Sequence, residues 1–173
     1  MAATTGRYEQ IDGQPMVRFE RTFPHPISAV WAAITDPGQL EGWFPTTVEF
    51  DQLRAGAAIV FRFAEDRYPS MNGEILELRP PERLVFTWGG DRLTFELEPR
   101  EEGAACRLAF TVVLDSADKA ARDSAGWEAC LDQLDLVAGG RQPVRPAETG
   151  KWEDYYAAYQ CLGLPATAPI PDH

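Results

Sequence analysis

The stretch MVRFERTFPHPISAVWAAITDPGQLEGWF, residues 16–44, is the most informative part of this chain for predicting its fold. Its first part predicts a strand, with one face made by Val17, Phe19, Arg21 and Phe23. Pro26 then opens a helix, because its missing N–H costs nothing in a first turn. The apolar residues of that helix recur at helical spacing, at Ile27, Val30, Trp31 and Ile34. Asp36-Pro37-Gly38 ends it, and a second short helix runs to Trp43.

Strands are predicted on both sides of this helix pair. Residues 6–23 form a hairpin in this prediction, since Asp12-Gly13 is a dipeptide that a tight two-residue turn prefers. Six further strands are predicted at 48–51, 57–63, 71–78, 83–88, 92–98 and 106–114. In the last two, apolar and polar residues alternate strictly, which is typical of an antiparallel sheet with one face in water.

One long helix follows the strands, over about 117–138. Its apolar stripe consists of Trp127, Cys130, Leu131, Leu134, Val137 and Ala138, and Glu128, Asp132 and Asp135 lie away from that stripe. A helix of 20 residues is ~30 Å long, similar to the longest predicted strand. The element order therefore predicts an α+β fold in which a curved sheet wraps around the last helix, with a cavity between them.

After residue 140 the sequence predicts a linker and a short helix outside the main domain. RQPVRPAETG, residues 141–150, is a linker between a single domain at 1–140 and a short helix. That helix carries four aromatic residues on one face, Trp152, Tyr155, Tyr156 and Tyr159, before Gly163 and Pro165 end it. So short a helix is not stable alone. Either it folds back on its own domain or it forms a homodimer contact. Residues 165–173 are expected to be disordered.

Size and composition exclude several classes of protein. The 173 residues, 45% of them hydrophobic, suit one domain with a substantial core. The formal charge of −11 opposes binding to nucleic acid. No apolar run approaches the ~20 residues of a membrane helix, and the N-terminus shows no apolar signal region, so we expect a cytoplasmic protein. Three scattered cysteines and two histidines predict neither a disulfide framework nor a metal site.

The sequence shows no catalytic motif with persuasive spacing. It has no GxSxG, HExxH, phosphate-binding loop or glycine-rich dinucleotide turn, so neither catalytic residues nor a cofactor are predicted. His25 lies between two prolines just before the first helix. It is either a capping or packing residue there or a group that responds to pH.

The aromatic residues give the clearest functional signal. Several lie on the predicted inner faces of neighbouring strands and, with residues from the helices, could line an apolar cavity. The set is Trp43, Phe61, Phe63, Met71, Phe86, Trp88, Phe95, Trp127 and Leu131. The alternative is a filled core, because buried aromatic side chains pack densely in most domains. Weaker candidates for polar groups at a pocket mouth are Arg62, Arg67 and Glu74.

Four segments together resemble a known superfamily: FERTFPHPISAVWAAITDP (19–37), EGWF (41–44), GEILELRPPERLVFTW (73–88) and GWEACLDQL (126–134). They are similar to the START-like superfamily, which includes the birch-pollen allergen and polyketide cyclases. The closer resemblance is to the branch named for the activator of the heat-shock chaperone ATPase. It implies a helix-grip fold, with a seven-stranded antiparallel sheet around the C-terminal helix and a cavity between them. The N-terminal hairpin and the aromatic tail lie outside this pattern.

Three functions follow from these observations. The first is non-enzymatic binding of a small hydrophobic molecule in the cavity. The second is a co-chaperone-like or regulatory module in the stress response, which the family's namesake implies and to which the acidic surface and aromatic tail could contribute. This resemblance covers one domain and not the partner-binding N-terminal domain of the eukaryotic co-chaperones. The third is an enzyme of cyclase, dehydratase or hydrolase type, which requires ionisable groups that face the cavity.

Overall fold

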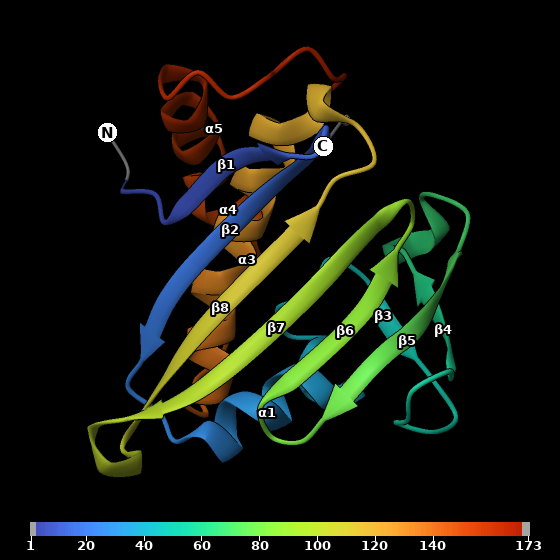
Figure 1. The fold of residues 1–173 in the computed structure, drawn as a ribbon, viewed down its shortest axis with the longest axis vertical. Coiled ribbons are helices and arrows are strands. Elements are labelled where there is room, and N and C mark those ends of the chain that lie inside the picture. The colour runs from blue at the N-terminus through green and yellow to red at the C-terminus, as the bar shows by residue number, and fades with distance from the viewer. Residues whose placement is uncertain (1–2, 171–173) are drawn as a thin grey trace.

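A computed structural model describes residues 3–170, and its centre is one antiparallel sheet (Figure 1). Eight strands within these residues pair in the order β1-β2-β8-β7-β6-β5-β4-β3. The strands are β1 (Gly6–Ile11), β2 (Gln14–Phe23), β3 (Thr47–Glu49), β4 (Ala58–Arg62), β5 (Met71–Arg79), β6 (Arg83–Trp88), β7 (Asp91–Arg100) and β8 (Ala105–Val113). Every neighbouring pair is antiparallel.

The predicted hairpin is present at one edge of the sheet. Asp12 and Gly13 have φ of 52° and 79°, the left-handed conformations that a tight hairpin turn requires. Register then pairs Ile11 with Gln14 and places Val17 and Phe19 on the buried face. With β1 as an added edge strand, the sheet has one strand more than the seven that the resemblance implies.

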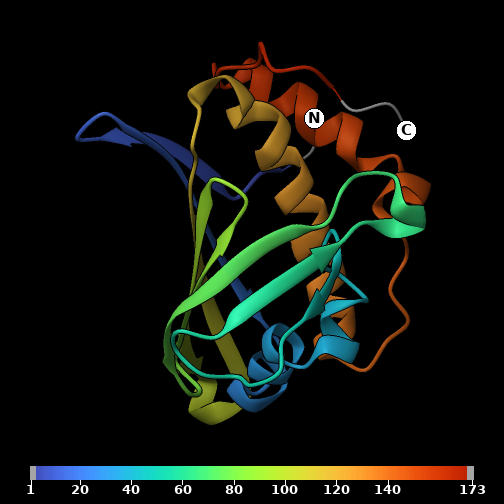
Figure 2. The same cartoon turned by 90° about the vertical axis from the view of Figure 1, so that its right-hand side faces the viewer.

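The helices lie at one end of the sheet and along its concave face. The first helices, α1 (Ile27–Thr35) and α2 (Pro37–Leu40), lie at one end of the sheet in Figure 1. The Asp36 carboxylate accepts a hydrogen bond of 2.9 Å from Gly38 N, which caps α2. The long helix α3 (Ala120–Ala138) runs along the concave face, and the sheet wraps around it in Figure 2. Short 3₁₀ turns occupy Ala64–Asp66, Glu101–Gly103 and Ala117–Lys119. The predicted helix-grip architecture is confirmed.

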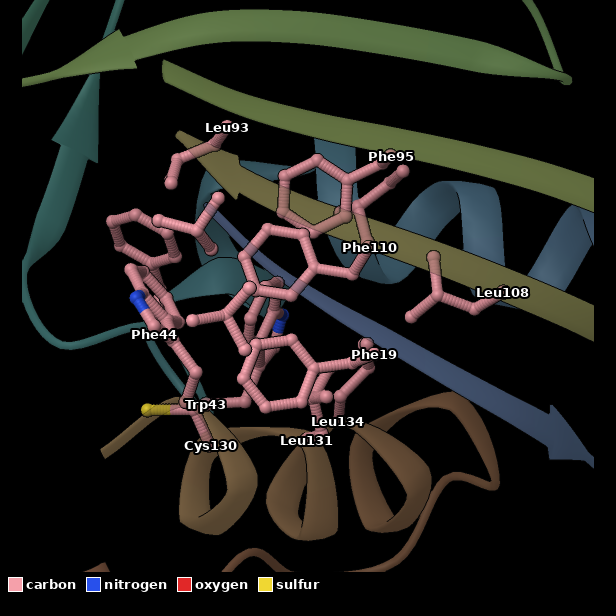
Figure 3. Packing of buried hydrophobic residues seen from close by; sticks show 14 of the residues in the cluster. Phe19, Trp43, Phe44, Leu93, Phe95, Leu108, Phe110, Cys130, Leu131 and Leu134 are labelled. Carbon is pink, nitrogen blue, oxygen red and sulfur yellow. The ribbon is translucent and has the colours of Figure 1, made fainter. Parts of the chain in front are cut away.

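Aromatic side chains fill the space between the middle of the sheet and α3 (Figure 3). The rings of Phe95 and Phe110 stack with centroids 4.5 Å apart, and Phe19 stacks on Phe110 at 5.7 Å. Trp127 of α3 meets Phe110 edge-on at 5.2 Å. A gap of about 10 Å³ beside Ile34 is too small for anything larger than one water. The middle of the sheet thus packs closely against α3 through these ring contacts.

The C-terminal segment folds back onto the same domain. After α4 (Pro146–Thr149), helix α5 (Lys151–Cys161) packs against α3 near β1, as the two views show. Tyr155 and Tyr159 are buried in that contact, which takes two of the four aromatic residues away from the alternative homodimer surface. Trp152 and Tyr156 are half-buried and stack on each other at 4.9 Å.

Residues 165–170, which the sequence predicts to be disordered, have backbone hydrogen-bond partners in the structure. Ala121 N donates a 2.9 Å hydrogen bond to Pro165 O, and Ala168 N donates one of 3.1 Å to Asp118 O. These bonds use backbone groups at the start of α3, so the tail has partners that its composition did not reveal. Residues 171–173, to which the same expectation applied, lie outside the described part of the chain.

Candidate functional site

A pocket with a mostly apolar lining lies at the end of the grip where α3 begins. Its volume is about 600 Å³, within the usual range for small-molecule sites. Six parts of the chain line it: the first half of α3, the segment between β8 and α3, the turn between β6 and β7, the ends of β4 and β5, the loop before β3, and one residue of α5. The lining residues are Pro45, Phe63, Met71, Trp88, Gly89, Gly90, Asp91, Asp115, Lys119, Arg122, Asp123, Gly126, Trp127, Ala129, Cys130 and Trp152.

Aromatic rings make the apolar wall of this pocket. Trp88 ends β6 and packs between Phe63, with centroids 6.2 Å apart, and Trp127 of α3, also at 6.2 Å. Gly89, with φ of 56°, turns the chain directly after Trp88, so the indole stands at the rim of the sheet. Trp88 and Phe63 are only half-buried, in contrast to Phe61, which is fully buried one layer deeper.

The nine sequence-predicted lining residues divide between this pocket and the solid core. Phe63, Met71, Trp88 and Trp127 line the pocket. The remaining five are buried in the core and do not line it: Trp43, Phe61, Phe86, Phe95 and Leu131. Among the strand residues, Phe63, Met71 and Trp88 lie at or just beyond strand ends, whereas Phe86 and Phe95 lie within their strands. The Trp43 indole N–H donates to Ala33 O at 2.7 Å, within the core.

The three residues proposed for a polar mouth lie elsewhere. Arg62 forms an exposed ion pair with Glu49 at 3.0 Å, and neither Arg67 nor Glu74 lines the pocket. The polar end is made instead by Asp91, Asp115, Lys119, Arg122 and Asp123. These residues lie at the start of β7, in the segment between β8 and α3, and in the first turn of α3, where apolar periodicity gives no signal. The sequence does show charged residues at the start of the predicted 92–98 strand and between the predicted 106–114 strand and the long helix. These charges were the one signal available for the polar end.

Lys119 organises this polar end. Its Nζ lies 2.6 Å from Asp91 Oδ1, 2.7 Å from Asp115 Oδ1 and 3.7 Å from Asp123 Oδ2. Burial alone would lower the pKa of Lys119, but hydrogen bonds to Asp115 and Asp91 outweigh it and raise that pKa. For Asp91, burial raises the pKa more than its hydrogen bonds from Lys119 and Asp115 N lower it. Asp91 is thus a buried carboxylate next to the pocket.

A second polar cluster lies on another face of α3. Glu128 is fully buried, and its carboxylate accepts hydrogen bonds from Arg21 Nη2 at 2.5 Å, Tyr159 Oη at 2.9 Å and the Thr5 hydroxyl at 2.9 Å. Arg21 also pairs with Asp132 at 2.7 Å. Glu128 does lie away from the apolar stripe, as predicted. It is buried nevertheless, because β1 and α5 cover that face.

Two further candidates have structural partners. His25 Nε2 lies 2.7 Å from Asp135 Oδ1 and 3.0 Å from Asp135 O, which connects the segment before α1 to the end of α3. These contacts favour the packing role for His25. Cys130 is buried at the pocket wall, and burial raises the pKa of its thiol to about 12. A thiol in that environment is a poor nucleophile.

Over residues 3–170, no three histidine, cysteine or acidic side chains gather closely enough to hold a metal ion. None of the helices described is both long and apolar enough to cross a membrane.

Comparison with protein families agrees with this architecture. The model of the family described as "Activator of Hsp90 ATPase homolog 1-like protein" matches residues 24–139, more than half of the chain. The chain belongs to this family. The matched segment contains every pocket-lining residue except Trp152. It excludes β1, β2 and α5, so Glu128 lies inside the family segment whereas Arg21 and Tyr159 lie outside it.

Solved structures extend the likeness over nearly the whole chain. A conserved protein of unknown function from Enterococcus faecalis, EF2215, is 18% identical with a TM-score of 0.71, and the alignment covers 91% of each chain. CalU16 from Micromonospora echinospora is 24% identical with a TM-score of 0.68, covering 93% of this chain and 98% of that one. The BPP1335 protein from Bordetella parapertussis is 25% identical with a TM-score of 0.64, covering 91% and 92%. A search of curated proteins found no match. The solved relatives therefore support the fold and assign no ligand.

Proposed function

We propose that this family member binds a small, largely apolar molecule in the pocket at the start of α3 and catalyses no reaction on it. The observation that carries the proposal is the aromatic wall of Phe63, Trp88, Trp127 and Trp152 around a pocket of about 600 Å³. Sites of this kind hold ligands by burying apolar surface, and a few polar groups orient the ligand.

The incomplete burial of the wall supports this proposal. Phe61 and Phe86 are 0% and 4% exposed, whereas Trp88 and Phe63, next to them in the same cluster, keep part of their surface accessible. Burial of apolar surface contributes about 25 cal/mol per Å². A ligand that covers these rings would gain that free energy without any rearrangement of the core.

The enzyme alternative has one observation in its favour, the buried Asp91 with its raised pKa. However, Asp91 Oδ1 accepts hydrogen bonds from both Asp115 N, at 3.0 Å, and Lys119 Nζ, at 2.6 Å. These bonds connect the start of β7 to the segment that leads into α3. The geometry therefore favours a structural role for Asp91.

The partner-binding alternative is weakened by a different observation, because the aromatic face of α5 is partly buried.

Binding of Nile red, a neutral apolar dye, tests the proposal through a variant that fills the pocket. Gly126 lines the pocket, and a Cβ at this position would have as its nearest neighbour Trp152 Nε1 at 3.9 Å. Gly126→Leu therefore extends into the pocket without a backbone clash. We expect saturable dye fluorescence with the unmodified chain and at least about tenfold weaker binding by Gly126→Leu.

Ala157→Leu is the matched control, because Ala157 is exposed on α5 and does not line the pocket. It should bind the dye as the unmodified chain does, and thermal melting should show that both variants are folded. The proposal fails if the unmodified chain gives no saturable binding, or if folded Gly126→Leu binds the dye as tightly.

A further inference from the structure

The polar end of the pocket carries more negative than positive groups. Its charged members are three carboxylates, on Asp91, Asp115 and Asp123, and two cations, on Lys119 and Arg122. The charge of the whole chain, −11, has the same sign as this excess. A field of this sign attracts cations to a cleft and repels anions from it.

Both cations already have anionic or carbonyl partners. Lys119 lies within hydrogen-bonding distance of two carboxylates, at 2.6 and 2.7 Å. Arg122 pairs with Asp123 at 2.8 Å and donates to Pro169 O at 2.9 Å. A ligand carboxylate that approached either cation would lie next to the carboxylate of the protein that already pairs with that cation.

A ligand cation meets the opposite situation. The Asp115 side chain is 48% exposed at the pocket rim, so its carboxylate can accept from a ligand without first leaving Lys119. The indole rings of Trp88, Trp127 and Trp152 complete the wall, and indole faces attract cations more strongly than other aromatic side chains do. The indole walls and the carboxylate at the rim thus both favour a positive charge on the ligand.

We propose that the pocket selects aromatic ligands whose polar group is a cation or a neutral hydrogen-bond donor, and discriminates against carboxylates with the same ring. This inference rests on the proposed function and specifies its ligand class. Three naphthalene derivatives of nearly equal shape test it: 1-naphthylmethylamine, 1-naphthalenemethanol and 1-naphthoic acid. Their dissociation constants would be measured at pH 7.4 by tryptophan fluorescence and by calorimetry.

We expect the amine to bind most tightly and the acid at least about tenfold more weakly than the amine. Asp115→Asn keeps the side-chain shape, which matters because the Asp115 carboxylate packs against Gly90. This variant should reduce the ratio of the two affinities by about fivefold, the effect of one partly exposed charge. Glu102 lies in the turn between β7 and β8 and does not line the pocket. The control variant Glu102→Gln makes the same change in charge and should leave the ratio unchanged.

The inference is overturned if the acid binds as tightly as the amine, if Asp115→Asn leaves the ratio unchanged, or if none of the three compounds binds. The Nile red titration reports separately on the proposed function. Saturable dye binding together with any of these results would retain the pocket as a ligand site and reject only its preference for charge.

Discussion

Replacing Arg21 with methionine should destabilise the fold far more than a typical loss of one ion pair. Arg21 Nη2 lies 2.5 Å from the carboxylate of Glu128, whose side chain is 0% exposed. Burial lowers the pKa of Arg21, but its interactions with Glu128 and Asp132 outweigh burial and raise that pKa. Without the guanidinium, a desolvated carboxylate would keep only neutral donors. Such a change costs about 3–5 kcal/mol, a large part of the 5–15 kcal/mol typical of a domain.

Urea unfolding followed by tryptophan fluorescence measures this cost. With a slope of about 2 kcal/mol per molar, the midpoint of Arg21→Met should fall by about 2 M. Arg18→Met is the matched control on the same strand, because Arg18 lies on the outer face and pairs with an exposed glutamate. Its midpoint should hardly move, since such surface pairs contribute little.

The double variant Arg21→Met/Glu128→Met separates the charge effect from lost packing. Removing both charged groups leaves no uncompensated carboxylate, so the double variant should be more stable than Arg21→Met alone. The reasoning is refuted if Arg21→Met shifts the midpoint no more than Arg18→Met does, or if the double variant is the less stable of the two.

Three other predictions concern the same architecture. Burial and nearby carboxylates raise the pKa of Tyr155 and Tyr159 above 10, so the unfolded chain loses these phenolic protons first. The free energy of unfolding should therefore fall as pH rises above about 10, and the fall measured by urea titration should be smaller in Tyr155→Phe/Tyr159→Phe. Gly6→Ala would place a Cβ 2.3 Å from Tyr159 Oη and should lower the free energy of unfolding by about 1–3 kcal/mol. Gly126→Ala in α3 should raise that free energy by about 1 kcal/mol. An unchanged urea midpoint for Gly6→Ala would contradict the packing described. Trp43→Phe leaves a buried carbonyl of α1 without its hydrogen-bond donor and should lower the free energy of unfolding by about 1–3 kcal/mol in the same assay. An unchanged midpoint would mean that this bond contributes nothing to stability.

Local signals were sufficient to predict the elements of the fold. Asp12-Gly13 determines its turn through backbone conformation alone. The strict alternation in β7, and the large apolar residues at every second position of β8, identify the buried face without knowledge of neighbours. These signals depend on residues close in sequence. For that reason the strands, the helix pair and the long helix with Trp127 facing the sheet could all be predicted.

The site depended on contacts that no local pattern contains. Phe95 and Phe110 stack across neighbouring strands and fill the centre of the grip, which moves the free volume to the start of α3. Glu128 is buried only because β1 and α5, distant in sequence, cover it. Trp152 lines the pocket for the same reason, since α5 returns to α3 after a linker. Sequence patterns showed which residues are apolar but not which of them remain partly uncovered.

Tryptophan indole signals in a ¹H–¹⁵N correlation spectrum give the most direct test of the pocket as a ligand site. The chain has five tryptophans, of which Trp88, Trp127 and Trp152 line the pocket. Titration with 1-naphthalenemethanol should shift these three indole N–H signals and leave those of Trp31 and Trp43 in place. Shifts of equal size at all five signals, or at none, would contradict a ligand site at the start of α3.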